Sequence, residues 1–167
     1  MAVTRIDQFM VSDVDVIIDT FRRSLKNPKN FEDDGRSCTR KGIQTLDIFR
    51  LDDFKPILNL LQDITKNISD KIDDSLECVC AHMIEYEGGG WQAIHHHGGE
   101  DVSFILYLTD NDDGQTYFKI DTGDGLDYEL HTFPKKGKLV FFDSVYYHGA
   151  KSTTTNKMVL VGGLKFV

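Results

Sequence analysis

The chain has 167 residues, of which 40% are hydrophobic and 28% are charged, a composition typical of one globular domain with a real core. Its formal net charge of −8 at pH 7 argues against a general affinity for nucleic acid or for an anionic membrane surface. No apolar run approaches the roughly 18 residues that span a bilayer, and the first residues contain no apolar signal region. We therefore expect a cytoplasmic protein with no nucleic-acid partner and no membrane partner.

The N-terminal part, residues 1–76, is predicted to be a helical support for a sheet. Apolar residues recur at helical spacing over residues 13–26 and again over residues 53–72, so each segment should form a helix with one apolar face. Between these helices, residues 27–43 are polar and rich in turn-forming residues, which predicts a long loop, and residues 44–50 could form a short strand. Both apolar helix faces should pack on a sheet, because neither helix is stable alone.

From residue 77 onward the spacing of apolar residues changes from helical to alternating, which indicates strands. The alternating segments are short and are separated by turns rich in aspartate and glycine, a pattern typical of a β-sandwich or jelly roll. The predicted strands cover residues 77–86, 91–97, 102–109, 115–120, 126–133, 138–143 and 157–166. No repeat or linker interrupts the chain, so we expect residues 1–167 to form a single domain whose core is residues 77–167.

The chain contains three cysteines, Cys38, Cys78 and Cys80, and an odd number without a signal region argues for free thiols. Cys78, Cys80 and His82 alternate as in a metal motif. On a strand, however, the first and last of these residues lie roughly 13 Å apart, which is too far for one tetrahedral ion. Packing of this strand face in the core is the better interpretation.

Three consecutive histidines, residues 95–97, are the main candidate for a metal site. On a strand, His95 and His97 point to the same face while His96 points to the other. Neutral imidazoles bind iron, zinc, copper and nickel. A third ligand has to come from elsewhere in the fold, and His148 is the natural candidate.

Six short motifs follow one another in the second half of the chain. A tyrosine and a glycine turn precede the first histidine, and a strand ending in Tyr-Leu follows it. A G-x-T-x-F element, a P-x-x-G-x-L-x-F-F element, a distal histidine and a basic residue complete the order. The residues concerned are Tyr86, Gly88, Gly90, His95, Tyr107, Leu108, Gly114, Thr116, Phe118, Pro134, Gly137, Leu139, Phe141, Phe142, His148 and Lys157. In this order, residues 77–167 resemble the iron(II)- and 2-oxoglutarate-dependent dioxygenases, most closely the prolyl 4-hydroxylase-like branch.

The resemblance implies an α+β fold, mainly β, in which a double-stranded β-helix (jelly roll) rests on two N-terminal helices. It also implies an enzyme that uses Fe(II), 2-oxoglutarate and O₂ to hydroxylate a substrate, with release of succinate and CO₂. The substrate, a protein, a peptide or a small molecule, stays open, and peptidyl proline is the candidate that analogy suggests. The polar loop at residues 27–43, with Arg36, Arg40 and Lys41, is a candidate lid.

The same resemblance implies a pocket for the cosubstrate. Lys157 resembles the basic residue that binds the 5-carboxylate of 2-oxoglutarate, although arginine is more common in the family and grips a carboxylate with two donors. Tyr107 resembles the tyrosine that donates its hydroxyl to that carboxylate. Tyr86 resembles a further aromatic residue of the pocket, near the substrate mouth.

The metal-binding motif departs from the family at one position. The family has H-x-D, whereas this chain has H-x-H, so the resemblance implies that His95, His97 and His148 bind the Fe(II). Loss of the carboxylate leaves the site one unit more positive. Glu100 or Asp101 could supply a carboxylate from the following loop instead. His97 is favoured because it shares a strand face with His95.

Two other interpretations of the pattern stay open. The run from Gly89 to His97 matches the G-x₅-H-x-H of cupin metalloproteins, which carry out other chemistry, but the cupin glutamate and second cupin motif are missing. A binding module that kept the fold and lost catalysis would also explain the missing carboxylate. Metal content together with succinate production would distinguish all three.

Overall fold

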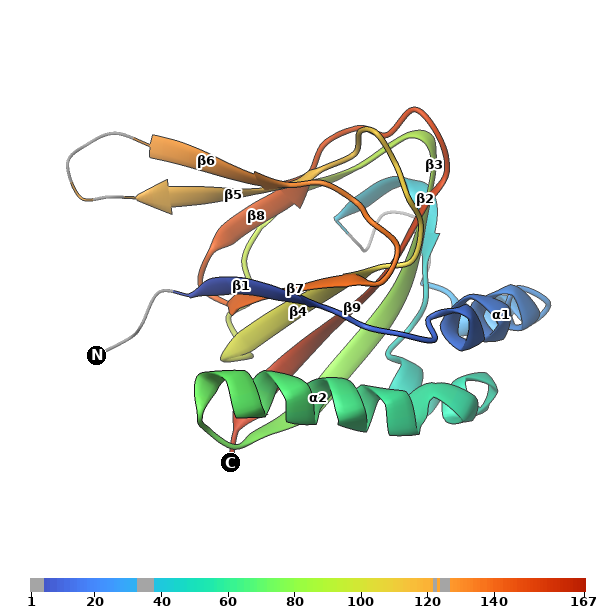
Figure 1. Ribbon diagram of the computed structural model, residues 1–167. Coiled ribbons are helices and arrows are strands. Elements are labelled where there is room, and N and C mark those ends of the chain that lie inside the picture. The colour runs from blue at the N-terminus through green and yellow to red at the C-terminus, as the bar shows by residue number, and fades with distance from the viewer. Residues whose placement is uncertain (1–4, 33–37, 122, 124–126) are drawn as a thin grey trace.

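The computed structural model describes residues 5–32, 38–121, 123 and 127–167, and over these residues the chain forms a curled antiparallel sheet with helices on its outer face (Figure 1). The strands are β1 (Ile6–Met10), β2 (Thr39–Gln44), β3 (Leu76–His95), β4 (Val102–Tyr107), β5 (Thr116–Asp121), β6 (Asp127–Thr132), β7 (Lys138–Asp143), β8 (Tyr147–Ala150) and β9 (Lys157–Phe166). The helices are α1 (Asp15–Ser24) and α2 (Leu58–Ile72), together with short 3-10 helices at Pro28–Asn30, Ile48–Arg50 and Asp52–Ile57. This mainly β architecture with two α-helices confirms the predicted jelly-roll fold class.

Strand β3 connects the two parts of the curled sheet. The strand order is β1-β7-β4-β9-β3-β8-β5-β6, with β2 added beside β3. From Leu76 to Tyr86, β3 pairs with β9, and from Gln92 to His95 it pairs with β8. Figure 1 shows the β5–β6 hairpin and β8 lying across from β7, β4 and β9, so the sheet encloses an interior.

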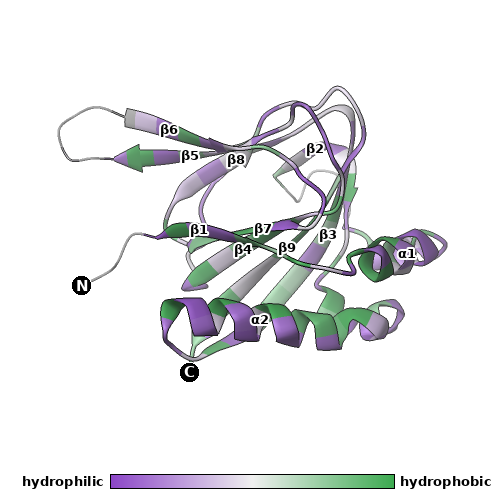
Figure 2. Ribbon diagram, in the orientation of Figure 1, coloured by the Kyte–Doolittle hydropathy of each residue, from purple (hydrophilic) through white to green (hydrophobic). Residues whose placement is uncertain are grey.

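Side chains of the strands divide between two apolar clusters, one on each face of the sheet. The larger cluster lies between the sheet and the helices and includes Phe21, Ile64 and Phe104. The smaller cluster fills the interior, because the ring centroid of Phe118 on β5 lies 4.8 Å from that of Phe142 on β7. Figure 2 shows apolar and polar residues alternating along α2, as expected for a helix with one buried side.

Both predicted helices form, with boundaries that differ from the prediction. Helix α1 spans Asp15–Ser24, which is shorter at both ends than residues 13–26. The second helix begins as the 3-10 helix Asp52–Ile57, which contains Pro56, and is α-helical from Leu58. Proline donates no backbone hydrogen bond, so regular α-helical bonding starts after it. Among the described residues, no helix is long and apolar enough to cross a membrane.

The strand predicted at residues 44–50 is wrong. The strand in this region is β2, which ends at Gln44, and Ile48–Arg50 forms a 3-10 helix. The Asp47 carboxylate caps this helix by accepting a hydrogen bond from the N–H of Phe49 at 3.3 Å. Backbone pairing with the distant strand β3 makes β2 a strand, and local sequence propensity does not report such pairing.

The predicted loop at residues 27–43 is also only partly a loop. Arg40 and Lys41 belong to β2, so these two residues of the candidate lid lie in a paired strand. Arg36, the third basic residue of that lid, lies outside the described residues.

The predicted glycine turn at residues 88–90 is part of β3 rather than a break between strands. Gly89 has a φ of +86°, and a Cβ on Gly90 would lie 2.5 Å from the carbonyl oxygen of Lys41. The glycines therefore allow β2 to cross close to β3 at the point where its register shifts. The two strands predicted on either side are consequently one strand, which ends at His95.

Five predicted strands agree with β4, β5, β6, β7 and β9 to within about two residues at each end, the usual uncertainty of strand boundaries. Strands β1 and β8 were not predicted. Strand β1 is half polar (I-D-Q-F-M) and becomes a strand by pairing with the edge of β7. Strand β8 has only four residues and is paired on both sides, by β3 and β5. Both strands depend on partners distant in the sequence.

The packing of α2 on the sheet gives a first prediction. Ile64→Ala should lower the free energy of unfolding by about 2–5 kcal/mol, because Ile64 is 1% exposed and its removal leaves a cavity between α2 and the sheet. Gln62→Ala, on the exposed side of the same helix, should change it by less than about 0.5 kcal/mol. Urea denaturation of both variants measures the difference. Equal losses would contradict the assigned packing face.

Candidate metal centre

Three histidines from two strands and a loop converge at one end of the curled sheet. His95 ends β3 and pairs with His148 of β8, and their ring centroids are 4.4 Å apart. His97 lies two residues beyond β3, where its backbone N–H donates to the carbonyl oxygen of Ser144 at 3.0 Å. One ligand atom from each of His95, His97 and His148 lies within 4.8 Å of the other two. The three histidines predicted from the sequence therefore form one cluster that could hold a metal ion.

Hydrogen bonds determine which nitrogen of two of these rings can bind a metal. Nδ1 of His95 lies 2.8 Å from the carbonyl oxygen of Ala93, and Nδ1 of His148 lies 3.0 Å from the carbonyl oxygen of Tyr146. A carbonyl oxygen only accepts, so Nδ1 carries the proton in each ring and Nε2 keeps a free lone pair. In metal-binding histidines, the ring nitrogen that does not bind the metal generally donates a hydrogen bond of this kind.

Burial keeps two of the imidazoles neutral. His148 is 3% exposed and packs against Phe142, with ring centroids 4.7 Å apart. This burial lowers the pKa of His148 to about 3. Burial also lowers the pKa of His97, although the nearby charge of Glu100 opposes that shift. Both rings are therefore uncharged at neutral pH, which is the state that binds a metal.

A cavity of about 330 Å³ adjoins the three histidines, a volume that suits a small organic ligand. Part of its lining is apolar and includes the buried Ile84, Ile105 and Phe142 and the half-buried Val161. Its polar lining includes Glu32, Gln44, Cys80, His82, Gln92, Glu100 and Ser103. The cavity thus combines a dry wall with polar groups beside the candidate ligands.

Glu100 lies beside the histidine cluster, outside the set of mutually close ligand atoms. Its Oε2 is 3.8 Å from Nδ1 of His97. Cys80 Sγ donates to Oε1 at 3.1 Å, and Ser103 Oγ donates to Oε2 at 3.3 Å. Burial and, next, the Glu100 carboxylate raise the pKa of Cys80 to about 12, so the thiol stays protonated and remains a donor. The sequence alone linked neither Cys80 nor Ser103 to the site.

The three cysteines are free, as predicted. The interpretation of Cys78 and Cys80 as one core-facing pair is wrong for Cys80, which lines the cavity, whereas Cys78 packs against the cluster under the helices. A register shift between these two residues in the β3–β9 pairing sends them to different faces of the sheet. Such a bulge leaves no signal in the alternating sequence pattern.

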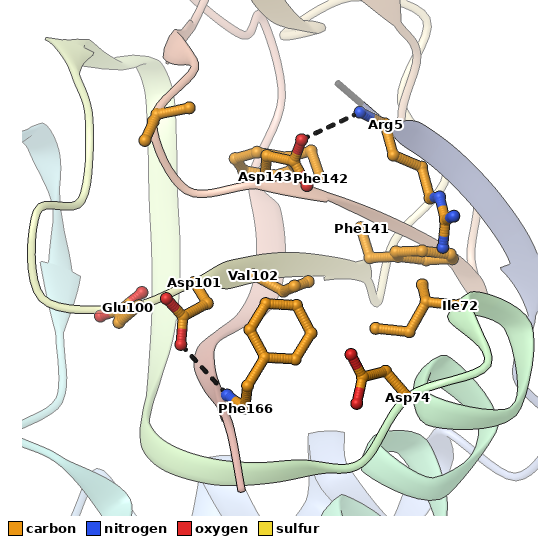
Figure 3. Close-up of a pocket in the computed structure, with 11 residues that line it drawn as sticks. Arg5, Ile72, Asp74, Glu100, Asp101, Val102, Phe141, Phe142, Asp143 and Phe166 are labelled. Carbon is orange, nitrogen blue, oxygen red and sulfur yellow. Dashed lines mark hydrogen bonds between the residues drawn. The ribbon is translucent and has the colours of Figure 1, made fainter. Parts of the chain in front are cut away.

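A second cavity, of about 410 Å³, adjoins the first, because Glu100 and Phe142 line both (Figure 3). Asp101 faces this second cavity, where its Oδ2 accepts a hydrogen bond from the N–H of Phe166 at 3.1 Å. Figure 3 shows this bond to Phe166, the last residue of β9, and Asp101 is not among the mutually close ligand atoms of the histidine cluster. The carboxylate of Asp101 therefore anchors the C-terminal strand, and its position does not favour a role as metal ligand.

The residues predicted for a cosubstrate form a separate, buried group. Lys157 is 1% exposed, its Nζ donates to the carbonyl oxygen of Gly114 at 2.6 Å, and it lies 4.4 Å from the ring centroid of Tyr86. The hydroxyl of Tyr107 donates to Thr116 Oγ1 at 2.6 Å. Among the described carboxylates, none forms an ion pair with Lys157. This group therefore offers a cation and a hydroxyl in the interior of the fold.

The pKa values of this group follow from its burial. Burial lowers the pKa of Lys157 to about 8, and the charge of Asp113 opposes the shift. Burial raises the pKa of Tyr107 to about 12 and also raises that of Tyr86. At neutral pH the lysine is therefore charged, and both phenols keep their protons.

Lys157, Tyr86 and Tyr107 do not line the cavity at the histidines. Their strands nevertheless connect the two places, because Lys157 and Val161 lie on the same face of β9, four residues apart. At ~3.3 Å per residue this separation is roughly 13 Å along the strand. The side chains between them belong to the interior apolar cluster, so the lysine lies deeper in the same interior.

Comparison with known proteins supports the predicted resemblance at the level of the fold. No family model matches the chain, and no curated protein matches its sequence. The structure matches a prolyl-4-hydroxylase of Pseudomonas putida with a TM-score of 0.69 and 18% identity, over 99% of this chain and 95% of that one. It matches the viral collagen prolyl hydroxylase of Paramecium bursaria Chlorella virus-1, solved as a 2-oxoglutarate complex, with a TM-score of 0.66 and 17% identity, over 97% and 96%. The non-heme α-ketoglutarate-dependent epimerase SnoN of nogalamycin biosynthesis matches with a TM-score of 0.78 and 13% identity, over 98% and 78%.

The histidine cluster gives the prediction for this site. His95→Ala, His97→Ala and His148→Ala should each lose most of the affinity for a divalent metal, because each removes one of the converging ligand atoms. His96→Ala is the matched control, since His96 is exposed and its ring packs on Tyr147 instead. Anaerobic Co(II) titration followed by absorption measures the affinities. Equal binding by His96→Ala and the three other variants would place the metal elsewhere.

Proposed function

We propose that the protein is an Fe(II)- and 2-oxoglutarate-dependent oxygenase that hydroxylates a substrate and releases succinate and CO₂. The observation that carries this proposal is the convergence of three histidine ligand atoms within 4.8 Å beside a cavity in a fold that such oxygenases share.

The donor set suits Fe(II). Nitrogen donors from neutral imidazoles bind this ion well, and three protein ligands leave positions free for a chelating cosubstrate and for O₂. Burial keeps His97 and His148 neutral, and hydrogen bonds through Nδ1 already orient the rings of His95 and His148. When bound, the iron and 2-oxoglutarate supply the oxidising power for C–H hydroxylation, while the chain supplies the ligands and a water-poor environment. The buried rings of Phe118 and Phe142 beside His148 provide that environment.

The interior group suits the 5-carboxylate of 2-oxoglutarate. We assign Lys157 as its cationic partner, because a buried ammonium with only a carbonyl acceptor and an aromatic ring gains most from an anionic ligand. In the proposal, the carboxylate takes the place of the Gly114 carbonyl oxygen as acceptor. Tyr107 is assigned as the hydroxyl donor, and Tyr86 forms the aromatic wall beside the ammonium.

Two prolyl hydroxylases among the structures with this fold support a protein or peptide substrate, with peptidyl proline as the first candidate. The epimerase with the same fold shows that this architecture also serves other reactions of 2-oxoglutarate-dependent enzymes, so the fold alone does not define the substrate. In the proposal, the cavity at the histidines receives the reacting group. The partly exposed Gln92 there offers an amide group to a peptide backbone.

Turnover tests the proposal. Protein loaded with Fe(II) under argon and then given 2-oxoglutarate and O₂ should form succinate, and proline-containing peptides that are substrates should gain the mass of one oxygen atom. His95→Ala should abolish both signals and His96→Ala should keep them. Metal binding without 2-oxoglutarate binding would indicate different chemistry of the cupin kind. Binding of both without succinate would indicate a non-catalytic module.

The assignment of Lys157 gives a separate prediction. Lys157→Met should raise the dissociation constant of 2-oxoglutarate about 10- to 100-fold, because a charge-assisted contact is worth roughly 1.5–3 kcal/mol. Tyr107→Phe should raise it less, since a neutral donor is lost. Lys165→Met, an exposed lysine of the same strand, is the control. Titration of Mn(II)-loaded protein measures all three, and an unchanged constant in Lys157→Met would reject this anchor.

The pH dependence of the same binding has a defined sign. Lys157 is charged below its pKa of about 8 and loses its charge as the pH rises through that value. Affinity of the Mn(II)-loaded protein for 2-oxoglutarate should therefore fall above about pH 8, by up to tenfold per pH unit. In Lys157→Met the affinity should be low and independent of pH over that range. A wild-type affinity that stays constant up to pH 10 would contradict the assignment.

A further inference from the structure

We propose that Glu100 is a positioning residue of the metal centre: its carboxylate orients His97 and supplies, from outside the three imidazoles, the negative charge that the motif lacks. The inference rests on the proposed function and concerns how the same site holds its metal. It differs from the alternative in which Glu100 itself is the third ligand.

The three histidines differ in the group that contacts Nδ1 of the ring. His95 and His148 each donate through Nδ1 to a backbone carbonyl oxygen. Among the described residues, no hydrogen bond holds the ring of His97, and Oε2 of the Glu100 carboxylate lies 3.8 Å from its Nδ1. That distance is longer than a hydrogen bond, so the contact is electrostatic in the metal-free protein. Attraction to the carboxylate favours the His97 ring with its proton on Nδ1 and Nε2 free for the metal.

The carboxylate is held in place by its surroundings rather than by His97. Cys80 and Ser103 each donate a hydrogen bond to one of its oxygens, at 3.1 and 3.3 Å. The side chain of Glu100 is 15% exposed. A Cβ on Gly163 would overlap the carboxylate, so only glycine at that position of β9 leaves room for it. Glu100 therefore occupies a formed site on the wall of the cavity.

A chain of contacts links this carboxylate to the backbone of His97. Ser103 Oγ lies 2.7 Å from Ser144 Oγ, and the carbonyl oxygen of Ser144 accepts the backbone N–H of His97 at 3.0 Å. The same two serines thus fix Glu100 at one end and His97 at the other. This arrangement fixes the carboxylate of Glu100 relative to the backbone of His97.

The charge of a divalent ion explains why the site needs a carboxylate such as that of Glu100. Three neutral imidazoles leave a divalent ion uncompensated in a half-buried site, which is costly. A carboxylate beside the imidazole of a ligand lowers that cost without occupying a coordination position of the metal. The motif therefore becomes H-x-H-x-x-E. His97 occupies the position of the aspartate in H-x-D, and the negative charge lies three residues later, at Glu100.

Anaerobic Co(II) titration tests the inference, with the d–d absorption band reporting the ligand set. Glu100→Gln keeps the size of the side chain and removes its charge, and it should weaken Co(II) binding about 10-fold or more, as is usual for an outer partner of a metal ligand, with the band shape retained. Gly163→Ala should weaken binding similarly by displacing the carboxylate. Asp101→Asn is the matched control, since it removes an adjacent charge that faces the other cavity, and it should bind Co(II) like the wild type.

A double substitution separates charge from packing. In His97→Asp the metal gains a carboxylate ligand of its own, so adding Glu100→Gln to this variant should no longer weaken binding. Equal affinity of wild type and Glu100→Gln would overturn the inference, and so would an equal loss in both backgrounds, which a packing role produces. A changed absorption band in Glu100→Gln, with His97→Ala keeping its metal, would also overturn it and make Glu100 the ligand. Failure of the wild type to bind 2-oxoglutarate would instead count against the proposed function alone.

Discussion

The pairing of His95 with His148 across β3 and β8 is the constraint on which the site depends. These residues are 53 positions apart in the sequence (148 − 95 = 53) and meet because β3 is long enough to leave β9 and continue into the other part of the sheet. In an antiparallel pair, residues that face each other place their side chains on the same face. A shift of one residue in this register would send one ring to each face and separate the two donors.

Burial gives the interior its chemical character. An imidazole that loses its charge on burial becomes a better metal donor, as His148 illustrates, whereas an ammonium that keeps its charge becomes a strong anion site, as Lys157 illustrates. Both effects come from removal of water, and each costs stability in the metal-free protein. The apolar contacts of the interior cluster and of the helices on the outer face offset that cost.

The sequence predicted five strands and both helices because these features have local signals, whereas the meeting of His148 with His95 was predicted from the order of the motifs. Alternation predicted a common face for His95 and His97, and helical spacing identifies residues 13–26 and 53–72. The features that were not predicted depend on distant partners. Strand β2 needs the edge of β3, and β8 needs neighbours on both sides.

His97 joins the cluster for a reason that differs from the predicted one. It was expected to share a strand with His95, but β3 ends at His95 and the carbonyl oxygen of Ser144 holds the backbone of His97 instead. Because that bond comes from the loop after β7, the orientation of the third histidine depends on a contact 47 residues away (144 − 97 = 47). Sequence spacing gave the right residue here, whereas tertiary structure gives the mechanism that places it.

In the proposed site, a histidine stands where the motif that this chain resembles has a carboxylate. A carboxylate ligand brings charge and coordination together in one short side chain, whereas an imidazole brings coordination alone and presents a second nitrogen on its far side. A carboxylate that does not bind the metal can interact with this second nitrogen and so influence the metal through the ring. Glu100 lies where such an action is possible, three residues after His97 and against Gly163 of β9. In the proposed site, separating charge from coordination would leave the metal with three nitrogen donors and would let Glu100 adjust its electrostatic environment without changing its ligands.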